Sequence, residues 1–172
     1  VVALALFFFQ TGPWSTASIW FTQGAIDSSA VLHQGEWWRL FTALTLHANL
    51  AHLLGNCLIG GPVIYLLGGT IGYGQSWLLL LCSGAIANFC NILLRQQLHL
   101  SVGFSTSVFA AIGLLTGLQL ARTARPSLKA LLLPLGAGVG LLTFLGSEGA
   151  QADLGAHLFG FVCGIACGWL GW

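Results

Sequence analysis

The chain has 172 residues, of which 5% are charged and 56% hydrophobic, and its mean hydropathy is +0.88. This number of charged residues is too small to solvate the surface of a soluble domain, and the composition therefore predicts an integral membrane protein. The formal net charge is +1 and the basic residues are dispersed apart from one small cluster, which argues against a nucleic-acid partner.

The apolar segments predict six transmembrane helices in a single domain over residues 1–172, because each span needs about 20 mostly apolar residues. The first ends near Gln10 or Phe21, since Gly12 and Pro13 interrupt it. The others are predicted at residues 47–70, 75–94, 104–121, 128–146 and 152–172. The expected fold class is an all-α polytopic membrane bundle. Because the chain begins with Val1 rather than Met, we expect a core from which an N-terminal region is missing.

A long connection, from about Thr22 to Leu46, joins the first two predicted spans. Loops of this length usually have structure of their own or a function. Its aromatic side chains suit a segment that lies in the membrane interface. We expect Trp38 and Arg39 to anchor this long interfacial loop.

The cluster Arg122, Arg125 and Lys129 lies between the fourth and fifth predicted spans. The positive-inside rule places this loop in the cytoplasm, and with six spans both termini are then cytoplasmic. The predicted outer loops carry the four acidic residues, Asp27, Glu36, Glu148 and Asp153.

The second, fourth and sixth predicted spans run in one direction, so their N-terminal ends share the outer face. Ser105 opens the fourth span, and His157 lies roughly 8 Å into the sixth at about 1.5 Å per residue. Polar residues at membrane depth are costly and indicate a functional site. We therefore predict that Ser105 and His157 meet near the outer surface.

A serine hydroxyl becomes a nucleophile when an imidazole accepts its proton, and the resulting oxyanion needs hydrogen-bond donors. His52 and Asn56 are four residues apart on the second span, and with the backbone N–H of Ser105 they are candidate donors. Packing alternatives stay open, because Ser105 could bond its own backbone and the other three side chains could join helices. Ser107 is a second candidate hydroxyl, about 200° around the helix from Ser105.

Small residues recur every fourth position on two predicted spans, and such faces let helices pack closely. They are Gly113 and Gly117 on the fourth span and Gly160, Gly164 and Gly168 on the sixth. Contact between these faces would bring Ser105 and His157 within reach of one another.

Four motifs follow one another along the chain: Gly35–Thr42 (GEWWRLFT), the H-x-x-x-x-H-x-x-x-N run of His47, His52 and Asn56, Gly103–Ser105 with Gly113, and the A-H-x-x-G-x-x-x-G run from Ala156 to Gly164. In this order, over nearly the whole chain, they resemble the rhomboid family of intramembrane serine proteases.

The resemblance implies a six-helix rhomboid-like bundle with a Ser105–His157 dyad that acts through an acyl-enzyme. His52, Asn56 and the Ser105 N–H would stabilise the oxyanion. The substrates would be transmembrane segments of other membrane proteins within the lipid bilayer. No cofactor or metal is expected, and the five cysteines, all in apolar runs, are predicted to be packing residues. A six-span core also implies a bacterial plasma membrane.

Two positions depart from the family pattern, since Thr106 replaces a common Gly and Phe109 replaces a common Tyr. Phe109 is one turn from Ser105 and keeps an aromatic ring to stack on an imidazole. Thr106 adds bulk and stiffness, so either the neighbouring helix accommodates it or the dyad is held open.

Thr106 therefore motivates an alternative, a catalytically silent rhomboid-like protein that binds transmembrane helices. A proton or ion pathway ranks last, because the spans lack the buried carboxylates and broken helices of transporters.

The remaining expectations concern single positions and the cavity. His47 is expected to cap or orient the loop, and His33 and His99 to have no special role. Asp153 is expected to cap the sixth helix rather than complete a triad. We also predict a water-accessible cavity ringed by His52, Asn56, Ser105 and His157, with a gate formed by the fifth span and the loop 146–153.

Overall fold

The computed structural model describes residues 1–95, 98–123 and 153–171, together with residues 128, 129, 132, 136 and 140. The predicted gate, formed by the fifth span and the loop 146–153, lies almost entirely outside these residues. Arg125 of the predicted basic cluster is also outside them.

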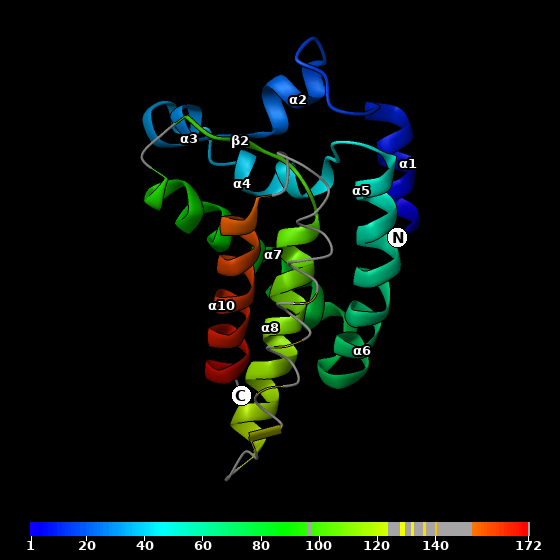
Figure 1. Cartoon of the computed structure of the whole chain (residues 1–172), viewed down its shortest axis with the longest axis vertical. Coiled ribbons are helices and arrows are strands. Elements are labelled where there is room, and N and C mark those ends of the chain that lie inside the picture. Colours follow the sequence, from blue (N-terminus) through cyan, green and yellow to red (C-terminus); the bar gives the residue numbers. More distant parts are fainter. Residues whose placement is uncertain are drawn as a thin grey trace.

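Long helices form the body of the described part of the chain (Figure 1). A continuous helical stretch consists of α5 (Leu50–Gly55), the π-helix η2 (Asn56–Gly60) and α6 (Gly61–Ile71). The others are α7 (Tyr73–Leu94), α8 (Ser105–Arg122) and α10 (Leu154–Leu170), and the shorter α1 (Val2–Thr11) lies beside α5. The helices predicted at 75–94, 104–121 and 152–172 are thus present, and the first helix ends at Thr11, near the earlier of its two predicted ends.

The connection between α1 and α5 has structure of its own, as its length predicts. It contains α2 (Ile19–Gly24), β1 (Ile26–Asp27), α3 (Ser28–Gln34), α4 (Arg39–Thr42) and the 3-10 turn η1 (Ala43–Thr45). Strand β1 pairs antiparallel with β2 (Leu100–Ser101), with Ile26 opposite Ser101. The described fold is mostly helical, as expected, and this small two-stranded sheet ties the loop to the segment before Ser105. Figure 1 shows these short elements gathered at one end of the long helices.

Arg39 anchors this loop from the inside. Its side chain is buried and donates hydrogen bonds to the carbonyl oxygens of Thr22 (2.8 Å) and Ala25 (2.9 Å), and it pairs with Glu36 at 2.5 Å. The neighbouring Trp38 indole N–H donates to the carbonyl of Gln23 at 3.1 Å. Two adjacent side chains therefore hold α4 against the chain that precedes it.

Helices α8 and α10 pack through the predicted glycine faces. A Cβ atom at Gly113 or Gly117 would meet carbonyl oxygens of α10, and one at Gly160, Gly164 or Gly168 would meet carbonyl oxygens of α8. The two backbones therefore touch along their length, which confirms the packing predicted from the spacing. Almost every residue in the first half of α8 is buried, so α8 is the central helix.

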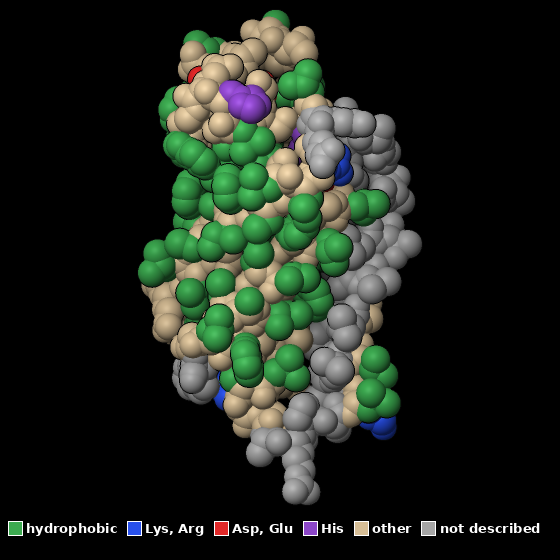
Figure 2. All heavy atoms as spheres, turned by 90° about the vertical axis from the view of Figure 1, so that its left-hand side faces the viewer, with side chains coloured by type: hydrophobic (Ala, Val, Ile, Leu, Met, Phe, Trp, Pro, Cys, Tyr) green, Lys and Arg blue, Asp and Glu red, His purple; other side chains and the backbone are tan. Residues whose placement is uncertain are grey.

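The outer faces of the helices are apolar. Residues 50–71 and α7 are long and apolar enough to cross a membrane, and α1 and α10 are apolar but shorter. On the face in Figure 2, hydrophobic side chains cover most of the height, whereas histidine and acidic atoms lie near the top. Exposed side chains such as Leu66, Leu78 and Leu94 suit contact with lipid rather than water.

Candidate active site

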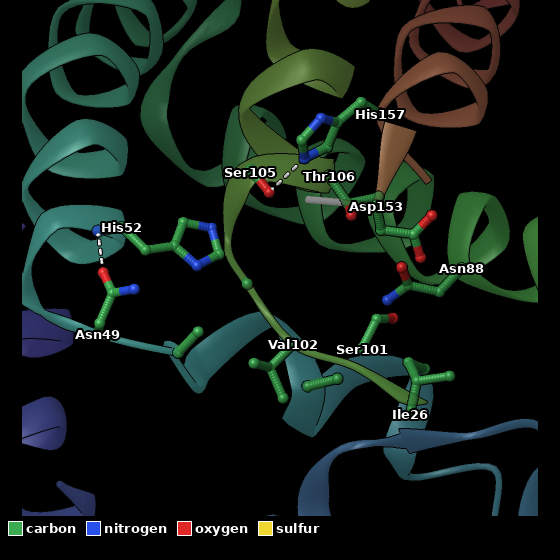
Figure 3. Close-up of a pocket in the computed structure, with 13 residues that line it drawn as sticks. Ile26, Asn49, His52, Asn88, Ser101, Val102, Ser105, Thr106, Asp153 and His157 are labelled. Atoms are coloured by element: carbon green, nitrogen blue, oxygen red, sulfur yellow. Dashed lines mark hydrogen bonds between the residues drawn. The ribbon is translucent and has the colours of Figure 1, made fainter. Parts of the chain in front are cut away.

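Ser105 and His157 meet at the N-terminal ends of two helices packed against each other. Ser105 is the first residue of α8, and His157 lies in the first turn of α10. A hydrogen bond of 2.7 Å joins Ser105 Oγ to His157 Nε2, and both residues are only 3% exposed (Figure 3). A hydroxyl held against an imidazole in this way can pass its proton to the ring as it attacks a carbonyl.

Phe109 fixes the plane of the His157 ring. The two rings are stacked, with centroids 4.6 Å apart and an interplanar angle of 23°, and Phe109 is fully buried. The aromatic residue one turn after Ser105 therefore contacts the imidazole as the sequence predicts. Among the described residues, His157 Nδ1 has no hydrogen-bond partner.

Asp153 caps α10 and does not complete a triad. Its Oδ1 accepts a hydrogen bond from the backbone N–H of Ala156 at 3.1 Å, as expected for an N-cap. Both carboxylate oxygens also bond to side chains from elsewhere in the chain, and no hydrogen bond joins this carboxylate to His157 in the described structure. Within the described residues, the Ser105–His157 pair therefore has no hydrogen bond to a carboxylate.

The side-chain partners of Asp153 come from α7 and the segment after it. Oδ2 accepts from Asn91 Nδ2 (2.8 Å) and lies 2.5 Å from His99 Nε2, and Oδ1 pairs with Arg95 at 3.1 Å. Burial acts to raise the pKa of Asp153, but the hydrogen bonds from His99 and Ala156 and the charges of His99 and Arg95 outweigh it and hold the pKa below its usual value. The expectation that His99 has no special role is therefore wrong.

A small polar cavity adjoins the dyad. Its volume is about 30 Å³, enough for about one water molecule, and its lining includes His52, Ser105, Thr106, Asp153 and His157. Thr106 lies in this lining while the dyad hydrogen bond stays at 2.7 Å. The β-branched side chain is thus accommodated and does not hold the dyad open.

His52 faces the cavity from α5 (Figure 3). Its backbone N–H donates to the side chain of Asn49, the N-cap of α5, at 2.8 Å. Between His52 and Ser105 lies Gly103, whose φ of +141° is strained for any side chain. A Cβ atom there would be 2.6 Å from His52 Cε1 and 3.3 Å from Ser105 Oγ. Glycine at this position therefore lets the imidazole of His52 approach the hydroxyl of Ser105.

Asn56 does not ring this cavity, contrary to the prediction. It begins η2, is buried, and lines a separate cavity of about 80 Å³ with Trp77 and Phe104. Both polar atoms of its side chain lack a hydrogen-bond partner within the described residues. Asn56 lies one turn deeper along the helix than His52, at about 1.5 Å per residue, so the two side chains reach different cavities.

The other candidates lie away from the dyad. Ser107 is buried against α7, where a Cβ atom at Gly84 would meet its hydroxyl. His47 is buried in the segment before α5. Its ring lies edge-on to the ring of His52, and the two ring centroids are 5.5 Å apart. Burial, assisted by the nearby His52, lowers the pKa of His47 to about 4, so it is neutral at pH 7.

Comparisons with known proteins point to one family. A family model described as a Rhomboid domain matches residues 34–172. RHOMBOID-like protein 1 of Arabidopsis thaliana is 31% identical over 154 residues, which cover 86% of this chain and 38% of that protein. Rhomboid-like protease 2 of Toxoplasma gondii is 31% identical over 146 residues, 81% of this chain and 50% of its own length.

A third relative, rhomboid protease GluP of Bacillus subtilis, is 33% identical over 92 residues, which cover 54% of this chain and 18% of that protein. The chain thus spans half or less of the length of each of these three relatives. Because the relatives come from a plant, Toxoplasma gondii and a bacterium, the expected assignment to a bacterial membrane is not supported.

Proposed function

The chain belongs to the rhomboid family of integral membrane proteins, and on that premise we propose that it is an intramembrane serine endopeptidase. The observation that carries the proposal is the buried hydrogen bond of 2.7 Å between Ser105 Oγ and His157 Nε2, next to a polar cavity large enough for about one water molecule. The hydroxyl and the imidazole have the partners and the surroundings that nucleophilic catalysis needs.

In the proposed reaction, Ser105 Oγ attacks the scissile carbonyl carbon while His157 Nε2 takes the hydroxyl proton. The oxyanion of the tetrahedral intermediate accepts hydrogen bonds from the backbone N–H of Ser105 and from the His52 ring, since both residues line the same cavity. Asn56 remains a further donor in this proposal, because both polar atoms of its buried side chain lack a hydrogen-bond partner within the described residues, although the side chain lines the neighbouring cavity.

His157 then gives its proton to the leaving amine, and the acyl group stays on Ser105. Water in the cavity attacks the acyl-enzyme, with His157 again as the base, and the serine hydroxyl is restored. All of the proton transfers use Ser105, His157 and water, so the reaction needs no cofactor.

The substrates we propose are transmembrane segments of other membrane proteins, which reach the dyad from the lipid. Ser105 and His157 lie in the first turns of their helices, toward the end of the bundle that carries the short elements (Figure 1). We retain the six-span topology as part of this proposal, with both termini and the 122–129 loop in the cytoplasm. The dyad is then near the outer membrane surface.

Covalent labelling tests the assignment. Detergent-purified protein is treated with a serine-directed fluorophosphonate, and we expect the wild type to be labelled and Ser105→Ala to be unlabelled. Ser107→Ala is the matched control, because it removes a buried hydroxyl from the same helix and should leave labelling intact. Labelling that survives Ser105→Ala would refute the proposal.

Cleavage of a panel of single-span substrates then tests the reaction itself. The silent rhomboid-like alternative predicts neither labelling nor cleavage, with binding of the same substrates intact. The dyad hydrogen bond beside Thr106 favours the active enzyme.

A further inference from the structure

One carboxylate joins three segments that are far apart in the sequence. Asp153 lies immediately before α10, Asn91 belongs to α7, and His99 lies between α7 and β2. The bonds that Asp153 makes to these two side chains span 62 and 54 residues of chain. The side chains of Asp153 and His99 are 8% and 12% exposed, so this contact is largely shielded from water.

His99 is in turn tied to the long first loop. Its backbone N–H donates to Ser28 Oγ at 3.0 Å, and its carbonyl accepts from the Ser28 N–H at 3.1 Å. The pairing of β1 with β2 continues this connection toward residue 101. The short segment that holds His99 then leads through Gly103 directly to Ser105.

The two halves of the dyad therefore depend on the same contact. His157 is one helical turn after Asp153, and its backbone N–H donates to the Asp153 carbonyl at 3.0 Å. Ser105 follows His99 by six residues, and the segment between them is also held by the pairing of β2 with β1 and by the Gly103 N–H, which donates to the Ala43 carbonyl at 3.0 Å. A change at the Asp153–His99 contact would therefore act on Ser105 through this short, well-held segment and on His157 through the first turn of α10.

We propose that Asp153 is a positioning residue for the Ser105–His157 dyad, which it aligns through its bonds to His99 and Asn91. The inference rests on the proposed protease function. Displacement of a reacting group by about 1 Å can reduce a rate by about 100-fold, so a tie this close to both groups should control the rate of acylation. The Asp153 tie should not control the affinity for the labelling probe, because the carboxylate bonds protein groups on the side of the cavity away from His52 (Figure 3).

The substitution Asp153→Asn separates this role from helix capping. An asparagine oxygen still accepts from the Ala156 N–H, so the cap is kept. The amide NH₂ is a donor, and it replaces an oxygen that accepts from Asn91 and contacts His99. Asp27→Asn is the matched control, because Asp27 caps α3 through the N–H groups of Ser29 and Ala30.

The experiment measures fluorophosphonate labelling over a range of probe concentrations, which separates the maximal labelling rate from the probe concentration at half-maximal rate. For Asp153→Asn we expect the maximal rate to fall about tenfold or more, with the half-maximal concentration close to wild type and a melting temperature that stays well above the assay temperature. Asp27→Asn should match the wild type in all three. An Asp153→Asn protein that is labelled at the wild-type maximal rate overturns the inference.

A second pair of variants keeps the test decisive if Asp153→Asn unfolds. His99→Gln removes the partner of Asp153 and His33→Gln changes an exposed histidine on α3. A slower maximal rate for His99→Gln alone supports the inference, and equal rates for the two variants overturn it. If the wild type itself is unlabelled, it is the proposed protease function that fails rather than the role of Asp153.

Discussion

Replacement of Gly164 by alanine tests the close packing of α8 and α10. A Cβ atom at Gly164 would lie 2.9 Å from the carbonyl carbon of Ala110 and 3.0 Å from its Cα, and closer still to its carbonyl oxygen. Ordinary contact begins at 3.4 Å, so the helices must separate by at least 3.4 − 2.9 = 0.5 Å. The obstacle is backbone rather than a flexible side chain, so the separation has to be a movement of the whole helix.

The expected cost follows from a comparison with Gly69→Ala. Gly69 is exposed on α6 with nothing within 4 Å of the added Cβ atom. Both variants gain about 1 kcal/mol of helix propensity, so the difference between them isolates overpacking. That difference should be about 1–3 kcal/mol in the free energy of unfolding. The same shift would lengthen the 2.7 Å dyad hydrogen bond and slow labelling of Ser105.

Unfolding of the two variants in detergent micelles, followed by circular dichroism across a denaturant series, measures this difference. Fluorophosphonate labelling of the same samples measures the effect on the dyad. If Gly164→Ala is as stable as Gly69→Ala and is labelled as fast as the wild type, the backbone contact between α8 and α10 does not hold the site together.

Three further predictions concern single side chains. Phe109→Leu keeps an apolar group but removes the stacking on His157, worth about 0.5–1.5 kcal/mol, so the labelling rate should fall up to about tenfold; an unchanged rate contradicts this role. Arg39→Lys removes the guanidinium group that bonds two backbone carbonyls and Glu36, so denaturant unfolding should show a free energy of unfolding lowered by about 1–3 kcal/mol. Wild-type stability of this variant would show that these bonds are dispensable. The hydrogen bonds and charges around Asp153 hold its pKa below the usual value of 3.8, so its carboxylate stabilises the fold above about pH 4 and this contribution is lost as the pH falls through the folded pKa. Melting temperatures between about pH 3 and 7 should show the advantage over Asp153→Asn shrinking only at the acid end.

The dyad could be predicted because local patterns encode it. Ser105 and His157 open two apolar segments of the same direction, and the glycine spacings on those segments predict the faces that bring them together. Phe109 was predictable for the same reason, since one helical turn separates it from Ser105. In each case a regular α-helix converts sequence spacing into position.

The remainder depends on irregular structure and on distant partners. The spacing of His52 and Asn56 predicts a shared face, but it does not predict that the side chain one turn deeper lines a separate cavity against Trp77 and Phe104. His99 lies outside the helices, where no helical repeat predicts which way a side chain points, and its partner Asp153 is 54 residues away along the chain. The available signal was electrostatic. The basic residues Arg95 and His99 and the acidic Asp153 lie in loops that are predicted on the same side of the membrane.

Gly103 has a consequence for which substitutions the chain can tolerate. Gly35 has a φ of 72° and a ψ of 25°, which is the left-handed region, and a Cβ atom there would meet nothing closer than 3.7 Å. At Gly103 a side chain would meet the strained φ and would also press on the His52 ring and the Ser105 hydroxyl. In a library of single substitutions selected for activity, position 35 should therefore accept residues that adopt a left-handed conformation, such as asparagine, whereas position 103 should retain glycine alone. Both the backbone conformation and the space beside His52 and Ser105 require glycine at this position, so every single substitution of Gly103 should lower activity.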